Sequence, residues 1–266
     1  MHPIERLRYV ARSEGAGQDL LARETAGALA AFQYDPAGLV TACRRIVDRQ
    51  PTAGALWWLT ARMLTAPEPM GEAYAAIGEL DEDLTPRRLA VELPDDATIT
   101  VLGWPEVTAR ALPRRGDIEV LVVDAAGEGS SMVRRLLGSD VEAVDVPSSG
   151  LGPAVVDSQV LVLEAHVVGP DSFVTVMGAR AAASTARLAG VPVWLVVPVG
   201  RLLPQRMWDA VMTRIDPLDD PWDRDEEIMS LELIDQVVGP VGLESIDDML
   251  KRTDSPVAPE LFKPLS

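Results

Sequence analysis

The chain has 266 residues, of which 47% are hydrophobic and 24% are charged, values typical of a folded globular protein. Its 24 basic side chains against 41 acidic ones give a net charge of −17. This balance argues against nucleic acid and membrane surfaces as partners, because phosphate polymers are bound by an excess of lysine and arginine, although a local basic patch could still hold one small anion.

Cysteine and histidine are too scarce for disulfide or metal chemistry. The single cysteine is Cys43, and the histidines are His2 and His166, so we expect no disulfide framework, no metal site and no cofactor. The start of the sequence lacks the pattern of a signal peptide. The most apolar run, 191–199, is far shorter than the roughly 20 residues that cross a bilayer. We therefore expect a cytoplasmic protein.

Residues 1–94 are predicted to form a helical domain. Apolar residues recur at intervals of three and four over 19–29, and a second helix is expected over 35–48, with an aspartate cap followed by proline. A third helix is expected over 51–64, and a further short helix follows it. Cys43 lies on the apolar stripe of the second helix, which indicates a buried structural thiol.

Residues 95–266 are predicted to form a Rossmann-like α/β domain with a C-terminal tail. The expected strands are 98–102, 118–123, 141–146, 159–163 and 193–197, and the helices between them are 105–112, 130–137 and 177–189, the last closed by Gly190. Continuous apolar strands that alternate with helices indicate a parallel sheet covered on both faces. Such sheets bind ligands at the carboxyl ends of their strands. The acidic stretch that begins at Asp216 is interpreted as a solvated loop.

Several short segments resemble, in the same order, those of one protein family. The segment Gln50-Pro51-Thr52-Ala53, followed by Leu56 and Trp58, resembles a motif of the methylthioribose-1-phosphate isomerases. Further segments that resemble the family are 99–108, 122–129, 160–165, 178–198 and 232–238.

The family contains those isomerases, ribose-1,5-bisphosphate isomerase, and the alpha, beta and delta subunits of translation initiation factor 2B. The resemblance runs from about residue 19 to residue 239 and implies a helical N-terminal domain followed by a Rossmann-like domain of the sugar-phosphate isomerase/CoA-transferase-like type. It also implies a dimer or a dimer of dimers.

The resemblance does not extend to the family's catalytic groups. Its isomerases use a cysteine and an aspartate, and they hold the substrate with an arginine and an Asn-Lys pair. The matching positions here are Gly103, Ala165, Gln50 and Thr175-Val176. Arg49 is one residue from the arginine position, and Glu164 and His166 flank the aspartate position. The losses weigh against isomerase chemistry, since a valine cannot replace a cation beside a phosphate.

Glu164 and His166 directly follow a buried strand, at the edge where a pocket is expected. Because residues two apart on a strand share a face, both could reach the pocket as an acid–base pair or as ligand contacts. In the alternative, one faces a helix and the other faces solvent.

The turn formed by Gly127, Glu128, Gly129 and Ser130 stands between a predicted strand and a predicted helix. Its backbone N–H groups could bind an anion, while Glu128 and Asp124 would oppose a phosphate. A purely structural turn explains the pattern equally well. The glycine-rich segment 148–153 leaves the same two alternatives open.

The sequence predicts a dimeric, non-catalytic scaffold that binds a small phosphorylated ligand (a sugar phosphate or a nucleotide) or a protein partner. The alternative is a divergent aldose–ketose isomerase that uses Glu164 and His166. No residue is assigned a catalytic role in the first hypothesis. The expected ligand contacts are Arg49, Gln50, Thr52, Gly103, Gly127, Gly129, Ser130, Glu164 and His166.

Overall fold

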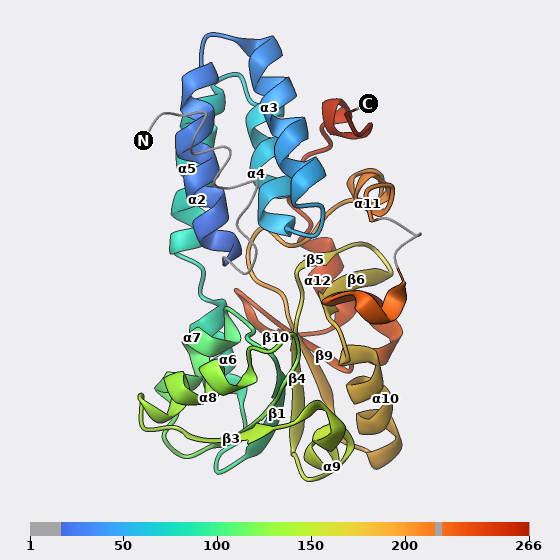
Figure 1. Cartoon of the computed structure of the whole chain (residues 1–266). Helices are drawn as coiled ribbons and strands as arrows, with labels where there is room; N and C mark the ends of the chain where they lie inside the picture. The colour runs from blue at the N-terminus through green and yellow to red at the C-terminus, as the bar shows by residue number, and fades with distance from the viewer. Residues whose placement is uncertain (1–16, 216–219, 266) are drawn as a thin grey trace.

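The computed structural model describes residues 17–215 and 220–265. Figure 1 shows a layer of helices above an α/β half, with a small sheet between the two. His2 and Asp216, the first residue of the acidic stretch, lie outside the described residues.

Four helices from the N-terminal part of the chain lie in the upper layer, α2 (Gln18–Leu29), α3 (Pro36–Arg49), α4 (Gly54–Thr65) and α5 (Pro69–Asp81), and α11 (Gln205–Met212) packs into the same core. The Asp35 side chain caps α3 by accepting the Gly38 N–H at 2.9 Å, as expected. Helix α4 lies at the centre, and both of its tryptophans are fully buried. Cys43 is also buried, which raises the pKa of its thiol to about 12 and confirms a packing role.

The stretch between residues 65 and 94 holds two helices, α5 and α6, where one short helix was expected. Helix α6 (Thr85–Glu92) follows α5 and, like α5, has a proline in its first turn. It packs against strands β9 and β10 and helix α7 of the α/β half. The division of the chain at residues 94 and 95 stays a prediction.

The large sheet has seven strands in the order β10-β9-β7-β4-β1-β2-β3. Their bounds are β1 (Thr98–Leu102), β2 (Glu119–Val123), β3 (Glu142–Val146), β4 (Val160–Glu164), β7 (Val193–Val196), β9 (Gln236–Gly239) and β10 (Gly242–Glu244). All neighbours are parallel except the β9–β10 hairpin. The five expected strands and the α/β fold class are confirmed, whereas β9 and β10 were not expected.

Helices cover both faces of this sheet because its side chains alternate between two cores. On β4, Leu161 and Leu163 belong to one core, and Val160 and Val162 belong to the other. The remaining helices are α7 (Thr108–Ala111), α8 (Gly129–Leu137), α9 (Leu151–Val156), α10 (Ala179–Ala189) and α12 (Ile246–Lys251). Figure 1 shows α7 and α8 on one side of the sheet and α10 on the other. Gly190 ends α10 in a left-handed conformation, as predicted.

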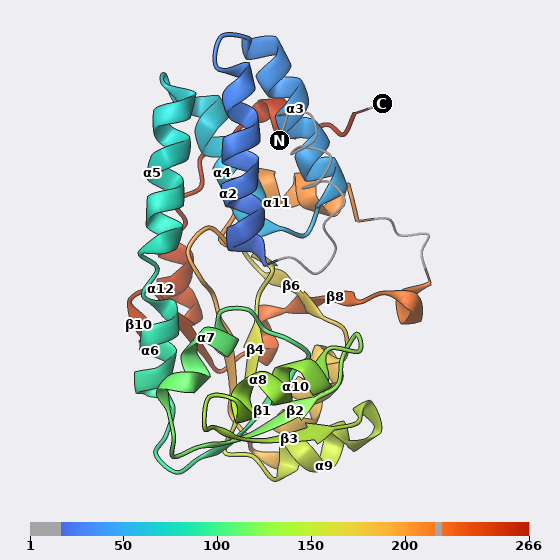
Figure 2. The same cartoon turned by 60° about the vertical axis from the view of Figure 1, so that its left-hand side comes forward.

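A second, antiparallel sheet contains β5 (Val167–Val168), β6 (Ser172–Val176) and β8 (Glu226–Ser230). The interpretation of the acidic stretch as a loop is therefore wrong for Glu226 and Glu227. These residues pair with β6, and the strand is held by the buried contact of Met229 opposite Phe173. Figure 2 shows β6 and β8 crossing between the helical layer and the large sheet.

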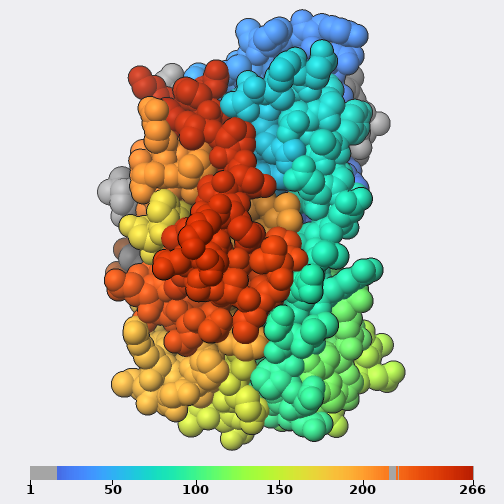
Figure 3. Space-filling view, turned by 180° about the vertical axis from the view of Figure 1, so that it is seen from behind, coloured from blue at the N-terminus to red at the C-terminus, as the bar shows by residue number. Residues whose placement is uncertain are grey.

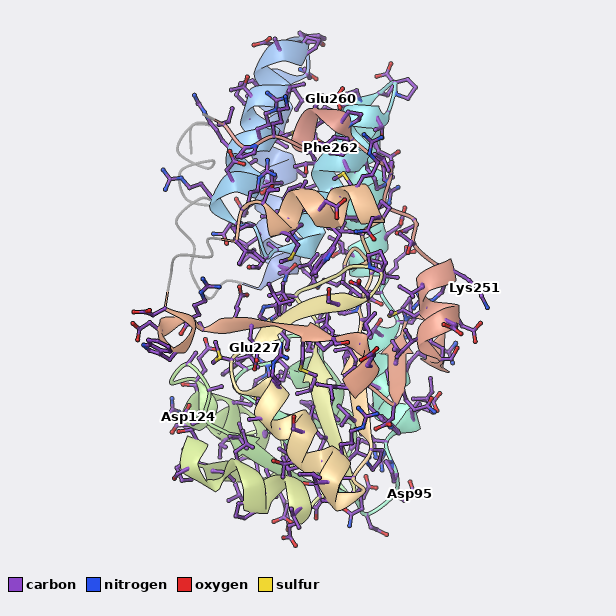
Figure 4. The ribbon with its side chains drawn as sticks, turned by 90° about the vertical axis from the view of Figure 1, so that its right-hand side faces the viewer. Asp95, Asp124, Glu227, Lys251, Glu260 and Phe262 are labelled. Atoms are coloured by element: carbon purple, nitrogen blue, oxygen red, sulfur yellow. The ribbon has the colours of Figure 1, made fainter. Side chains whose placement is uncertain are left out.

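The end of the chain returns to the helical layer. Ala258 and Leu261 are buried in the same core as α2, α3 and α4. Figure 3 shows this C-terminal segment crossing the back of the molecule, and Figure 4 shows Glu260 and Phe262 beside the N-terminal helices. The two halves of the chain are thus packed into one body around the cavity described next.

Candidate functional site

A cavity of about 1060 Å³ lies between the carboxyl edge of the large sheet and the helical layer. Its walls come from the ends of β1 and β4, from the segment that links α3 to α4, and from β6 and β8. The cavity therefore stands where parallel sheets place their ligands. Its volume exceeds that of most small metabolites, and its lining mixes apolar and charged side chains.

Four of the predicted ligand contacts line this cavity, namely Gln50, Thr52, Glu164 and His166. Arg49 ends α3 with an exposed side chain and does not line it. Gly103, Gly127, Gly129 and Ser130 also lie outside the lining, although Ala126 and Glu128 from the same turn belong to it.

Gly103 has a backbone reason to be glycine. Its φ is +61°, and its N–H donates to the Val123 carbonyl at 2.9 Å. A Cβ atom there would lie 3.3 Å from the Ala125 carbonyl oxygen. The position that resembles the family's catalytic cysteine is thus a tight, left-handed turn after β1.

The glycine-rich turn before α8 is closed by its own carboxylate. The Asp124 side chain accepts the Gly129 N–H at 2.9 Å, and the Ser130 hydroxyl binds Asp145. Gly127 supplies the positive φ, +76°, that the turn requires. These contacts use the groups that an anion would need, and they favour the structural alternative.

Glu164 is buried and acts as a local cap. Its carboxylate accepts the Val107 N–H at 3.0 Å, the Thr108 N–H at 2.9 Å and the Thr108 hydroxyl at 2.9 Å. Both carboxylate oxygens are therefore engaged where α7 begins. The carboxylate does not pair with His166, which separates the two residues of the predicted acid–base pair.

His166 instead pairs with a carboxylate from β8. Its Nδ1 lies in hydrogen-bond contact with Glu226 Oε1, 60 residues further along the chain. The side chains of His166 and Glu226 are each 32% exposed. Burial acts to raise the pKa of Glu226, but the hydrogen bond and charge of His166, together with a hydrogen bond from Thr52, hold it below its usual value.

Glu226 was not expected at this site because the acidic run was interpreted as a loop. The one available signal was the apolar pair Ile228-Met229 directly after the acidic residues, which belongs to the same paired strand, β8. No periodicity within so short a run identifies its partner strand.

Carboxylates outnumber guanidiniums around the cavity. The acidic residues of the lining are Glu128, Glu164, Asp223, Asp225, Glu226 and Glu227, and the arginines are Arg180, Arg214 and Arg224. Burial and the charges of Asp225 and Asp124 raise the pKa of Glu128. Within 17–215 and 220–265, no group of three or more His, Cys, Asp or Glu side chains is arranged to hold a metal ion.

The sequence matches no protein-family model and no curated protein. The structure, in contrast, is similar to that of the Pyrococcus horikoshii OT3 translation initiation factor eIF-2B, with a TM-score of 0.77 and 13% identity, over 91% of this chain and 96% of that chain. It is also similar to eIF2B beta from Chaetomium thermophilum, with a TM-score of 0.74 and 14% identity, over 99% of this chain and 93% of that chain.

A third similar structure is the tetrameric eIF2B-beta2-delta2 complex from C. thermophilum, with a TM-score of 0.76 and 14% identity, over 94% of this chain and 92% of that chain. The chain thus has the eIF2B alpha/beta/delta-like fold, which confirms the fold that the sequence resemblance implied. Among the described residues, no helix combines the length and the apolarity needed to cross a membrane.

Proposed function

We propose that the chain is a non-catalytic, ligand-binding protein on an eIF2B-like scaffold, and that the cavity is its binding site. The observation that carries this proposal is the engagement of Glu164, whose carboxylate is occupied by the backbone and hydroxyl of α7. The positions that resemble the family's catalytic cysteine and aspartate carry Gly103 and Ala165, which have no titratable side chain. The cavity can hold a small molecule, but neither of these two positions can supply a proton-transfer group.

A thermal-shift panel tests ligand binding by this cavity. It contains sugar phosphates, nucleoside monophosphates and unphosphorylated amines and sugars, because a ligand that binds only the folded chain raises its Tm. The variant Val176→Trp fills the cavity from β6, and Val144→Trp is its matched control on the exposed edge strand β3. A Tm shift that Val176→Trp abolishes and Val144→Trp retains supports the proposal. A panel without any shift overturns it.

We propose further that the chain forms a homodimer. Support comes from the similar tetrameric eIF2B-beta2-delta2 complex, in which related chains assemble with one another. Light scattering at micromolar concentration tests this assembly. A mass near that of one 28.6 kDa chain contradicts it.

The second candidate function is a divergent sugar-phosphate isomerase. The contact between Glu226 and His166 favours it, because a carboxylate orients an imidazole for acid–base work. Incubation with ribose-1,5-bisphosphate and methylthioribose-1-phosphate, followed by NMR, detects ketose formation. Turnover that disappears in His166→Gln establishes this candidate and overturns the non-catalytic one.

A further inference from the structure

Two of the three arginines that line the cavity, Arg214 and Arg180, bind groups of the protein itself. Arg214 has a side chain only 2% exposed, and it donates to Asp48 at 2.6 Å and to the Ala210 and Leu261 carbonyls at 2.8 and 2.9 Å. Arg180 lies 3.5 Å from Glu227 and also donates to the Ile228 carbonyl. An incoming anion would have to compete with these partners.

Two backbone donors near the cavity are also occupied. The backbone N–H of Arg180, in the first turn of α10, donates to Glu227 at 3.0 Å. The Gly129 N–H, at the start of α8, donates to Asp124. Phosphate binding relies on open guanidiniums and helix N-terminal N–H groups, and these two arginines and two N–H groups are already engaged within the protein.

The carboxylates of the lining are compensated unequally. Glu164 is stabilised by α7, and Glu227 by Arg180. Glu226 is hydrogen-bonded to Thr52 and His166, and about a third of its side chain remains exposed. Asp225 and Glu128 lie close enough to each other for their charges to interact. This part of the wall therefore carries more carboxylates than guanidiniums.

Apolar and aromatic side chains complete the lining. Leu102, Trp104, Val176 and Ile228 contribute to the same cavity. The ring of Trp104 already attracts a cation, since the Arg135 guanidinium lies 5.9 Å from its centroid. A carboxylate wall beside apolar and aromatic surface suits a molecule that joins a positive charge to an aliphatic body.

We infer that the cavity selects a small organic cation, an amine or guanidinium on an aliphatic body, whose N–H groups donate to Glu226, and that it rejects phosphate monoesters. The inference rests on the proposed function, because it names the ligand class of that same site. It differs from the sequence expectation of a phosphorylated ligand.

Isothermal titration of the full chain with matched probes tests the inference. The cationic probes are agmatine and putrescine, the neutral isostere is 1,4-butanediol, and the anionic probe is ribose 5-phosphate. We expect saturable one-to-one binding of at least one cation and no binding of the other two probes. Val176→Trp should abolish binding, because it fills the cavity.

Charge-neutral variants locate the anchor. Glu226→Gln should weaken cation binding about tenfold, the effect of losing one charged hydrogen bond. Asp225→Asn should leave the local backbone in place, because the carbonyl of residue 225 keeps the hydrogen bond from the Met177 N–H. This variant should weaken cation binding about threefold. Glu232→Gln, an exposed carboxylate outside the cavity lining, is the control and should leave binding unchanged.

The outcomes separate this inference from the proposed function. Binding of ribose 5-phosphate but of neither cation overturns the inference and leaves a small-ligand site in place. Cation binding that survives in Val176→Trp is attraction to the acidic surface and also overturns it. If no probe binds and the wider thermal-shift panel is silent as well, both proposals fail together.

Discussion

Replacing Glu164 by alanine removes the acceptor that holds the start of α7. Two backbone N–H groups, of Val107 and Thr108, and the Thr108 hydroxyl would then lack their partner in a buried place. Each orphaned donor costs about 1 kcal/mol when water reaches part of the vacated space, which gives a loss of about 3 kcal/mol. This is a large share of the roughly 5–15 kcal/mol that stabilises a folded chain.

Urea denaturation followed by circular dichroism measures this loss. A loss of about 3 kcal/mol corresponds to a Tm lowered by roughly 6–12 °C for a chain of this size. Thr108→Val removes only the hydroxyl and should cost about 1 kcal/mol. Glu232→Ala, at an exposed position, should stay within about 0.5 kcal/mol of the parent. If Glu164→Ala also stays within that range, Glu164 is not a cap and is again a candidate for acid–base chemistry.

Three further predictions test the packing and the charges of the site. A Cβ atom on Gly54 would lie 2.7 Å from the His166 carbonyl oxygen, so Gly54→Ala should lower the free energy of unfolding by about 1–3 kcal/mol. Gly78 lies in α5 with open space around its Cβ position, so the control Gly78→Ala should raise the free energy of unfolding by about 0.5–1 kcal/mol. Similar changes in the two variants would contradict the clash at Gly54. The pKa of Glu226 is lowered in the folded chain. The ionised Glu226 side chain therefore stabilises the fold above the unfolded pKa of about 4.3, and this stabilisation is lost as pH falls through the folded pKa. Glu226→Gln should therefore lower the Tm at pH 7 and converge with the parent in acid, and a pH-independent difference would refute this linkage. The pKa of Glu128 is raised, so its charged form is disfavoured in the folded chain. Glu128→Gln should therefore raise the Tm at pH 7, and this gain should disappear below a pH of about 4. A lower Tm of Glu128→Gln at pH 7 would contradict the crowding of carboxylates around Glu128.

The large sheet was predictable because its central strands are long apolar runs between clear helix signals. Strand β1 was expected at its observed bounds, and β4 within one residue of them. Strand β10 was missed because it has only three residues, too few for a period of two to stand out. Strand β9 is as short as β7, but it includes Gln236 and Gly239, whereas β7 is wholly apolar. One short helix was expected between residues 65 and 94, where the structure has α5 with 13 residues and α6 with eight.

The location of the candidate site was also predictable in part. Glu164 and His166 were expected at the carboxyl edge of the sheet and Thr52 among the ligand contacts, and all three line the cavity. Their partners were not predictable, because a sequence pattern does not report which donors reach a carboxylate. The turn at Gly127 illustrates the same limit, since it looks like an anion site until its contacts with Asp124 and Asp145 are known.

The type and order of the main elements, and the residues that arrive at the strand ends, were readable in the amino-acid sequence. These properties follow from local periodicity, caps and turn residues, which act over a few positions. The pairing of His166 with Glu226 and the capping of α7 by Glu164 became visible only in the folded chain. That arrangement depends on the pairing of β8 with β6 across some 50 residues of chain, a non-local contact whose free energy comes from burial and hydrogen bonding that no local pattern records.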